Sequence, residues 1–329
     1  MTERFAGWAD SGLPPASPGT VVTVGTFDGV HRGHELVCAR LAAHAERSGL
    51  SGVLITFEPH PLEIVNPSAA PPLITLWPEK LEVLAETGID YAAVLPFTST
   101  LARYTAAQFV DEVLRRRFHV RHLIIGYDHG FGRGREGDVE VLQALGAERG
   151  FGVEVVEPVC DAGGHPISST MIRRAVAGGD LRRAAIGLGR PYSVSGRVVP
   201  GAGRGRTLGY PTINLGPPPA RKLLPPQGVY AVRVQTPAGP FGGMMNLGPR
   251  PTFGDAQPAL EVHLFDVSRD LYDAPVRVEF VARLRDTRRF DSPAALAAQL
   301  ATDERDARHE LTRLGAATNM KDSTPMASS

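Results

Sequence analysis

The chain reads GTFDGVHRGH from Gly25 to His34, directly after a β-branched run, Val21–Val24. A segment with helical apolar spacing follows, so the pattern predicts a strand, a glycine turn and the start of a helix. Glycines let a backbone approach a ligand closely, and the N–H groups at a helix start favour phosphate. His31 and His34 stand three residues apart and share a face of the predicted helix. We therefore expect a nucleotide triphosphate to bind here, with two surface histidines near a turn as the alternative.

A second segment, Ile167–Arg173 (ISSTMIR), places hydroxyl side chains before a predicted helix that ends near Gly178. Ser169 or Thr170 could simply cap this helix, which is the alternative to a functional role. Arg173 would lie in the first turn, where a guanidinium can bind phosphate oxygens in a bidentate manner. Our hypothesis is that the two segments form the two ends of one ATP site.

Two polar loops follow further predicted strands. Thr56–Pro61 (TFEPHP) comes after Gly52–Ile55, and Gly126–Asp138 (GYDHGFGRGREGD) comes after His122–Ile125. Ligands of open parallel sheets bind beyond the carboxyl ends of the strands, so we expect both loops to line the site. For the second loop, a flexible basic turn is the alternative.

The second half of the chain has a different pattern. Its alternating segments indicate strands of an antiparallel, barrel-like sheet: Ser193–Val199, Gly228–Val234, Leu260–Phe265 and Val276–Ala282. A helix is predicted over Pro293–Leu314. We place domain boundaries at residues 1–188 and 189–315, and we expect residues 316–329 to form a disordered tail because they offer little apolar surface.

The sharpest motif of this half is Gly205–Leu215, which reads GRTLGYPTINL. Thr212 and Asn214 are two apart on an extended segment and share a face. Their neutral oxygens suit Mg²⁺ bound together with ATP, because Mg²⁺ prefers hard oxygen ligands. Gly201, Gly203 and Arg206 lie just before and within the motif, where backbone N–H groups and a guanidinium can bind phosphates. The alternative is a buried turn that satisfies its own polar groups.

Composition excludes several classes of protein. The 329 residues carry 35 basic and 35 acidic side chains, which gives no electrostatic case for nucleic-acid binding. No apolar run approaches the roughly 20 residues that span a membrane, and the start of the chain lacks a signal pattern. Cys38 and Cys160 are too few for a disulfide framework or a zinc cluster. We expect a cytoplasmic protein with reduced thiols and no nucleic-acid or membrane partner.

The motifs of the first half resemble, in order and spacing, the FMN adenylyltransferase module of the bacterial bifunctional riboflavin kinase/FAD synthetase family, over about residues 18–188. The His31–His34 pattern itself is similar to the nucleotidyltransferase signature. The later motifs resemble the riboflavin kinase module of that family over roughly residues 190–314: Gly205–Leu215, Gly228–Val232, Asn246–Gly254 and Glu261–Asp266. The implied fold is α/β, with a Rossmann-like nucleotidyltransferase domain containing a parallel sheet, then a mainly antiparallel β-barrel kinase domain with a C-terminal helix.

The resemblance also implies roles for individual residues. Glu261 would accept the proton of the ribityl hydroxyl, although a glutamate in a strand is usually just solvated. His31, His34 and Arg173 would stabilise charge during adenylyl transfer. The implied ATP and phosphate contacts are Gly25, Phe27, Asp28, Gly33, Ser168, Ser169, Thr170, Gly201, Gly203 and Arg206. The implied flavin contacts are Pro59, His60, Asp128, Phe131, Tyr210 and Arg285, and the implied Mg²⁺ ligands are Thr212 and Asn214. For Arg285 an ordinary exposed charge is the alternative.

The function that follows is phosphorylation of riboflavin with MgATP to FMN by the C-terminal domain, and adenylylation of FMN with a second ATP by the N-terminal domain, giving FAD and pyrophosphate. The family commonly has an aromatic-rich loop after Gly126, whereas this chain has His129 and Gly130. One alternative is therefore a riboflavin kinase with an inactive first domain. Another is a flavin- or nucleotide-binding sensor without turnover. A homo-oligomer also stays open.

Overall fold

The computed structural model describes residues 18–201, 204–249, 258–267 and 271–322. The chain divides into two compact units, residues 1–170 and 171–329, which are considered one at a time. The division falls in the first turn of helix α6 (Ser169–Ala177), so that most of α6 and all of α7 (Leu181–Leu188) belong to the second unit. The boundary at residue 188, which marks where the strand pattern changes, stays a prediction.

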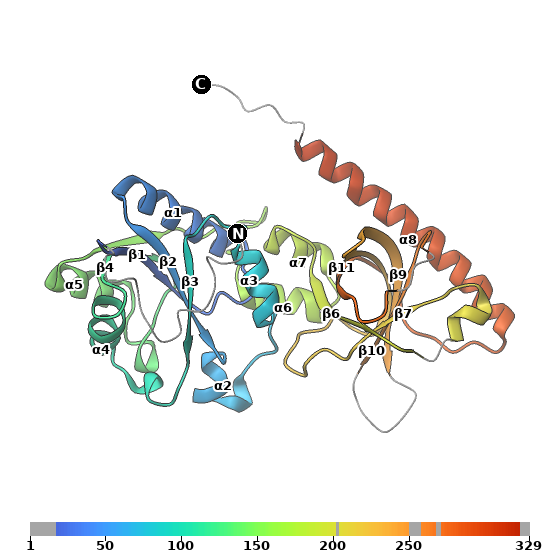
Figure 1. Ribbon diagram of the computed structural model, residues 1–329, viewed down its shortest axis with the longest axis horizontal. Helices are drawn as coiled ribbons and strands as arrows, with labels where there is room; N and C mark the ends of the chain where they lie inside the picture. The colour runs from blue at the N-terminus through green and yellow to red at the C-terminus, as the bar shows by residue number, and fades with distance from the viewer. Residues whose placement is uncertain (1–17, 202–203, 250–257, 268–270, 323–329) are drawn as a thin grey trace. The chain divides into compact units, whose positions relative to one another are not determined.

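The first unit is built on a parallel sheet with the strand order β3-β2-β1-β4-β5. Figure 1 labels β3, β2, β1 and β4 of this sheet. The strands are β1 (Thr20–Val24), β2 (Ser51–Glu58), β3 (Tyr91–Pro96), β4 (Val120–Gly126) and β5 (Gly152–Val156). This confirms the predicted parallel sheet. The chain adds β2 and β3 on one side of β1 and then crosses to add β4 on the other side. The crevice of such a sheet lies where this reversal occurs, at the carboxyl ends of β1 and β4.

Apolar cores cover both faces of the sheet, because successive side chains of a strand point to opposite faces. Val22 and Val24 of β1 belong to one cluster, whereas Val21 belongs to the other. Helix α1 (Arg32–Ser48) packs on β1 and β2 with its buried face, which includes Leu41. The remaining helices of this unit are α2 (Pro61–Val65), α3 (Trp77–Leu84), α4 (Ala106–Gln108), which continues into a π-helical stretch over Phe109–Arg115, and α5 (Val139–Arg149).

The second unit contains a closed barrel with the order β10-β7-β6-β11-β8-β9, in which every neighbouring pair is antiparallel. Its strands are β6 (Ser193–Val199), β7 (Ile213–Leu215), β8 (Gly228–Thr236), β9 (Gly239–Pro249), β10 (Pro258–Leu264) and β11 (Pro275–Arg285). The expectation of a barrel-like antiparallel sheet is confirmed. Closure leaves the barrel without an unpaired edge strand.

Helix α8 (Pro293–Asp322) packs against β8, β9 and β11. Ala307 on this helix is fully buried in a cluster with Met244 and Phe265. The helix continues to Asp322, past the end predicted at Leu314 and into the stretch expected to be disordered, while residues 323–329 lie outside the described residues.

Within the described ranges, none of the helices combines the length and the apolar composition that crossing a membrane would require.

Candidate functional sites

The loop between β1 and α1 has an unusual backbone that a buried carboxylate holds in place. Phe27 and Val30 have positive φ angles of 46° and 38°, which side-chain-bearing residues rarely adopt. The Asp28 carboxylate is 1% exposed and accepts hydrogen bonds from the backbone N–H groups of Ile74 (3.1 Å) and Thr75 (3.0 Å). These bonds occupy the side chain that we predicted to contact phosphate, and they give it a role in shaping the loop.

Two further contacts to this loop could not be foreseen from the motif. The Thr75 hydroxyl accepts a hydrogen bond from the N–H of Gly29 (2.9 Å). The buried ammonium group of Lys80 donates to the carbonyl oxygen of Thr26 (2.8 Å). Neither Thr75 nor Lys80 belongs to a recognisable pattern, so no sequence signal points to them. Together they fix the backbone that precedes helix α1.

His31 and His34 form a stacked pair at the start of α1. His31 is the N-cap residue and is 6% exposed, which argues against the alternative of two surface histidines. Its Nδ1 accepts a long hydrogen bond from the N–H of His34 (3.4 Å), so a neutral His31 ring has its proton on Nε2. The two rings are parallel within 20° at 3.6 Å, and Phe27 packs on His34 at 4.9 Å. The pair is thus held beside the first N–H groups of the helix, which lack intrahelical partners.

The segment 167–170 meets this loop, as the sequence hypothesis requires. The hydroxyl of Ser169 donates to the carbonyl oxygen of Asp28 (2.9 Å), which joins the start of α6 to the loop after β1. The Ser169 hydroxyl therefore donates its hydrogen bond to the loop. Ser168 is half-buried and Thr170 is exposed. Arg173 is half-buried and follows Ser169 by one turn on the same helix.

The predicted flavin contacts of the first unit occur after β2 and β4, the strands that flank β1 in the sheet. Pro59 and His60 are half-buried, and His60 caps α2 by accepting a hydrogen bond from the N–H of Leu62 (3.2 Å). Asp128 is exposed. Phe131 instead lies in the core, with its ring 4.7 Å from that of Phe109. Of the four residues, Phe131 is thus the one whose position is explained by packing.

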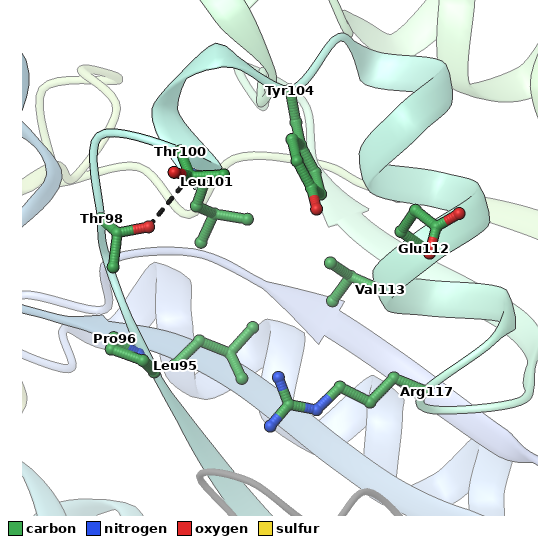
Figure 2. Close-up of a pocket in the computed structure, with 9 residues that line it drawn as sticks. All are labelled: Leu95, Pro96, Thr98, Thr100, Leu101, Tyr104, Glu112, Val113 and Arg117. Carbon is green, nitrogen blue, oxygen red and sulfur yellow. Dashed lines mark hydrogen bonds between the residues drawn. The ribbon is translucent and has the colours of Figure 1, made fainter.

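The first unit also contains a cavity that the sequence did not predict. It has a volume of about 260 Å³ and lies between the end of β3 and the π-helical stretch after α4. Figure 2 shows Arg117, Tyr104 and Glu112 among its polar lining residues, and Leu95, Leu101 and Val113 among its apolar ones. Pockets for small organic ligands usually measure about 300–1,000 Å³, so this cavity by itself is small for a flavin.

In the barrel, the register of the strands brings three polar residues into one row. Glu261 on β10 lies opposite Asn214 on β7 and opposite Asn246 on β9. Residues that pair directly across strands share a face of the sheet. Glu261 is half-buried, and its carboxylate makes no hydrogen bond or ion pair with any described residue. Asn246 lies within one of the motifs that we quoted, although its place in this row was not predicted.

A small cavity of about 30 Å³ lies beside this row. Its lining residues are Gly201, Arg206, Pro211, Thr212, Asn214 and Tyr272. The structure therefore brings together four predicted residues of the phosphate and metal site, whereas Gly203 lies outside the described residues. A Cβ atom at Gly201 would overlap the Asn214 amide, so a larger residue there would displace that side chain.

The oxygen atoms at this cavity are available to a ligand. The side chains of Thr212, Asn214 and Arg206 have no hydrogen-bond partner in the part of the chain that the structure covers. This does not fit a buried turn that satisfies its own polar groups. A hydroxyl and an amide oxygen without internal partners match the hard, neutral donor set of Mg²⁺, and the volume suits an ion or a water molecule.

Two predicted flavin contacts of the second unit have defined partners. The ring of Tyr210 packs edge-on against His263 at 5.1 Å, and burial is the main cause that raises the pKa of Tyr210. Arg285 forms a two-point ion pair with Asp303 of α8, at 2.8 Å from Nε to Oδ1 and 2.6 Å from Nη2 to Oδ2. Asp303 is 2% exposed. Arg285 is thus not an ordinary exposed charge, because it connects β11 to α8.

Two family models match the chain. The model of FAD synthetase matches residues 13–171, and the model of riboflavin kinase matches residues 188–311. The bifunctional riboflavin kinase/FMN adenylyltransferase of Escherichia coli (strain K12) is 42% identical over 291 residues, which cover 88% of this chain and 92% of the relative. The enzyme of the same name from Pseudomonas fluorescens is 40% identical over 297 residues, or 90% of this chain and 94% of the relative. The one from Bacillus subtilis (strain 168) is 33% identical over 292 residues, or 88% and 91%.

Among solved structures, a macrolide-efflux protein from Streptococcus pneumoniae is similar, with a TM-score of 0.80 and 33% sequence identity. The likeness covers 89% of this chain and 95% of that chain. A sheet unit followed by a barrel unit therefore occurs in an experimentally determined structure.

Proposed function

Because the chain belongs to the bifunctional riboflavin kinase/FMN adenylyltransferase family, we propose that each of its units performs one of the two reactions. The chain is an enzyme that makes FMN from riboflavin and FAD from FMN. One observation supports the assignment of reactions to units. The FAD synthetase model matches residues 13–171, which coincide with the sheet unit, and the riboflavin kinase model matches residues 188–311, which contain the barrel.

In the barrel, Glu261 is proposed to act as the general base. The ribityl hydroxyl oxygen forms a bond to the γ-phosphorus of ATP, the bond to ADP breaks, and the hydroxyl proton passes to the Glu261 carboxylate. Phosphoryl transfer depends mostly on positioning and charge stabilisation, but the attacking hydroxyl must lose its proton to a group within hydrogen-bond reach. This role is supported by the position of the Glu261 carboxylate, which is half-buried, lies in the row with Asn214 and makes no hydrogen bond with a described residue.

The cavity beside Glu261 is proposed to hold the phosphates and a magnesium ion. Thr212 and Asn214 would bind Mg²⁺ through their side-chain oxygens, and the ion, when bound, offsets the negative charge of the phosphates. Arg206 would bind phosphate oxygens through its guanidinium, since this residue lines the same cavity. Gly201 and Gly203 would let the backbone approach the phosphates. Tyr210 would contact the flavin at this site.

In the sheet unit, no protein nucleophile is needed. An oxygen of the FMN phosphate forms a bond to the α-phosphorus of ATP, and the bond to pyrophosphate breaks. The Nε2–H of His31, the neighbouring His34 and the N–H groups at the start of α1 would stabilise charge on the transferring and leaving groups. Ser168, Thr170 and Arg173 are proposed to bind the same phosphates, since the start of α6 is joined to the loop by Ser169.

Small residues and fixed loops would shape the remainder of this site. A Cβ at Gly33 would lie 3.1 Å from the His31 ring, so a glycine lets the histidine occupy the helix start. Gly25 and Phe27 would contact the bound nucleotide. Asp28 would contribute indirectly, by holding the backbone of the loop in its conformation. Pro59, His60 and Asp128 are proposed to contact the flavin because they follow the strands that flank β1.

We place the enzyme in the cytoplasm. Cys38 and Cys160 are both free, with Cys38 buried and Cys160 exposed. An exposed free thiol is the normal state in a reducing compartment. Both reactions also need ATP.

A chromatographic time course of the purified chain with riboflavin, ATP and Mg²⁺ tests the proposal. We expect FMN to rise first and then to give way to FAD. FMN as the final product would favour a kinase with an inactive sheet unit. Flavin binding without either product would favour a sensor.

A further inference from the structure

A group of three side chains outside both proposed sites has the composition of a metal centre. His44 comes from the second half of α1, His122 from β4 and Glu154 from β5, and one ligand atom of each lies within 4.8 Å of the other two. His44 Nδ1 is 3.7 Å from Glu154 Oε2, and His122 Nε2 is 3.9 Å from the same oxygen. The histidine rings are stacked, with centroids 3.9 Å apart.

The two nitrogen atoms are buried, and neither has a hydrogen-bond partner in the described ranges. Distances of 3.7 and 3.9 Å to the carboxylate exceed those of hydrogen bonds, which are about 2.7–3.2 Å for nitrogen and oxygen. A buried polar atom without a partner is costly, so such an atom usually indicates a bound water or ion that the structure does not include. Here two of them face one carboxylate.

The neighbouring strand leaves space for this arrangement. Gly152 on β5 pairs directly with His122 on β4. A Cβ atom at Gly152 would overlap the imidazole ring of His122, so a residue with a side chain could not stand there unless the ring moved. Glu154 is two residues along β5 and shares the face of Gly152. The glycine therefore allows the His122 ring to lie over the strand and toward the carboxylate.

We propose that His44 Nδ1, His122 Nε2 and a carboxylate oxygen of Glu154 bind one divalent transition-metal ion, for which Zn²⁺ is the best match. Two histidines and one glutamate are an established donor set for zinc, with bonds of about 2.0–2.2 Å. A tetrahedral ion with such bonds places its ligand atoms about 3.3 Å apart, so binding requires the ligand atoms to move closer and the stacked rings to tilt toward the ion. The fourth position is left for water. Copper and nickel also bind imidazole, and Zn²⁺ is therefore tested beside them.

The role of this ion is structural. His44 is separated from His31 by most of α1, at about 1.5 Å per residue, so the ion lies far from the histidine pair of the proposed adenylyl site. Its ligands come from a helix and two strands that are distant in sequence. A bound ion would thus link α1 to β4 and β5. It would stabilise the folded sheet unit, because the unfolded chain lacks the site.

The test is a titration of the untagged full-length chain after removal of metal with a chelator. Binding of Co²⁺ is followed by its visible absorption. Binding of Zn²⁺, Cu²⁺ and Ni²⁺ is compared by calorimetry. Thermal unfolding is measured with and without Zn²⁺. We expect the wild-type chain to bind one more metal ion per chain than the His122→Asn and Glu154→Gln variants do. We also expect Zn²⁺ to raise the unfolding temperature of the wild-type chain. The matched control is His119→Asn, which changes an exposed histidine next to β4. Asparagine tolerates the positive φ angle of that position.

A further variant keeps all three ligands. Gly152→Ala should displace the His122 ring and weaken Co²⁺ binding about tenfold or more, as changes around metal ligands commonly do. FAD formation by the metal-free Glu154→Gln protein should equal that of metal-free wild type, which also shows that the variant is folded. The proposal would be overturned if the wild-type chain and the variants His122→Asn, Glu154→Gln and Gly152→Ala bound the same number of metal ions with the same affinity. It would also be overturned if the wild-type chain bound none of the four ions.

Discussion

Glu261 on β10 lies directly opposite Asn214 on β7, although the two residues are far apart in the chain. The pairing joins the proposed base for the riboflavin hydroxyl to a proposed magnesium ligand, on one face of the barrel. It follows from the register of strands β7, β10 and β9, in which Glu261 also pairs with Asn246 on β9. The position of the kinase site is therefore a property of the closed barrel.

Glu261→Gln tests the base. The amide has almost the same shape as the carboxylate but cannot accept the proton, so riboflavin phosphorylation should fall about 10²- to 10⁴-fold. Adenylylation of supplied FMN should be unchanged, because that reaction is assigned to the other unit. Both rates are measured by chromatography. Glu310→Gln on α8 is the control and should behave as wild type. Equal losses of both activities would contradict separate sites.

His31→Ala tests the histidine pair. Removing one donor to the developing charge should lower FAD formation about 10²- to 10³-fold, while FMN continues to accumulate from riboflavin. The comparison variant is His119→Asn, with an exposed residue in the same unit. Normal FAD formation by the alanine variant would remove His31 from the mechanism.

Asp28→Asn distinguishes a role in loop shape from a phosphate contact. Asparagine turns an NH₂ group toward one of the two N–H donors of Ile74 and Thr75, which leaves a buried donor unsatisfied. The free energy of unfolding should drop by about 2 kcal/mol. Urea unfolding gives this value, with the exposed Glu140→Gln as control. Unchanged stability together with a raised KM for ATP would instead indicate direct contact with the nucleotide.

A double-mutant cycle tests the ion pair of Arg285 and Asp303. Arg285→Met alone leaves the buried Asp303 carboxylate without its charged partner, although the Gln299 amide still donates to it, and should destabilise the chain by about 3 kcal/mol. Adding Asp303→Leu should recover part of this loss, because the unpaired charge is then removed. Denaturant unfolding supplies the four free energies. If both single variants were as stable as wild type but bound riboflavin weakly, Arg285 would be a flavin contact.

The two cysteines should differ in reactivity. Burial raises the pKa of the Cys38 thiol to about 12, and the side chain is fully buried. Alkylation requires the thiolate, so iodoacetamide at pH 8 should modify Cys160 and spare Cys38 in the native protein. Mass spectrometry of the digested chain measures this, and unfolding in urea should make both residues reactive. Equal labelling of both residues in the native state would show that α1 opens readily.

Local features of the fold could be predicted from the sequence. The β-branched run before Gly25 and the glycine motif defined a strand, a turn and a helix start, because these depend on neighbouring residues. Alternation of apolar residues located four of the barrel strands, and Ser193–Val199 was predicted with its observed bounds. Strand β9 was not predicted. The helix at the end of the chain was predicted to be shorter than it is, since its last residues give little apolar signal.

Contacts between distant segments were harder to foresee. The motif that contains Asp28 gave no sign that its carboxylate would bond to residues 74 and 75, and Phe131 was predicted at the flavin although its ring completes the core. Arg285 resembled a ligand contact in the sequence, yet its partner is on another element. In each case the group that contacts the side chain belongs to another segment of the chain, outside the local motif.

The sequence by itself determined the strand, turn and helix start around Gly25, most of the barrel strands and the residue types of both proposed sites, because periodicity and turn motifs act over a few residues. Tertiary structure alone decided which of these side chains became buried supports and which stayed available to a ligand. Strand register placed Glu261 beside Asn214, and packing of α1 on the sheet placed His44 beside His122 and Glu154. The physical reason is that pairing and burial depend on how segments remote in sequence fit together, and local patterns do not encode that fit.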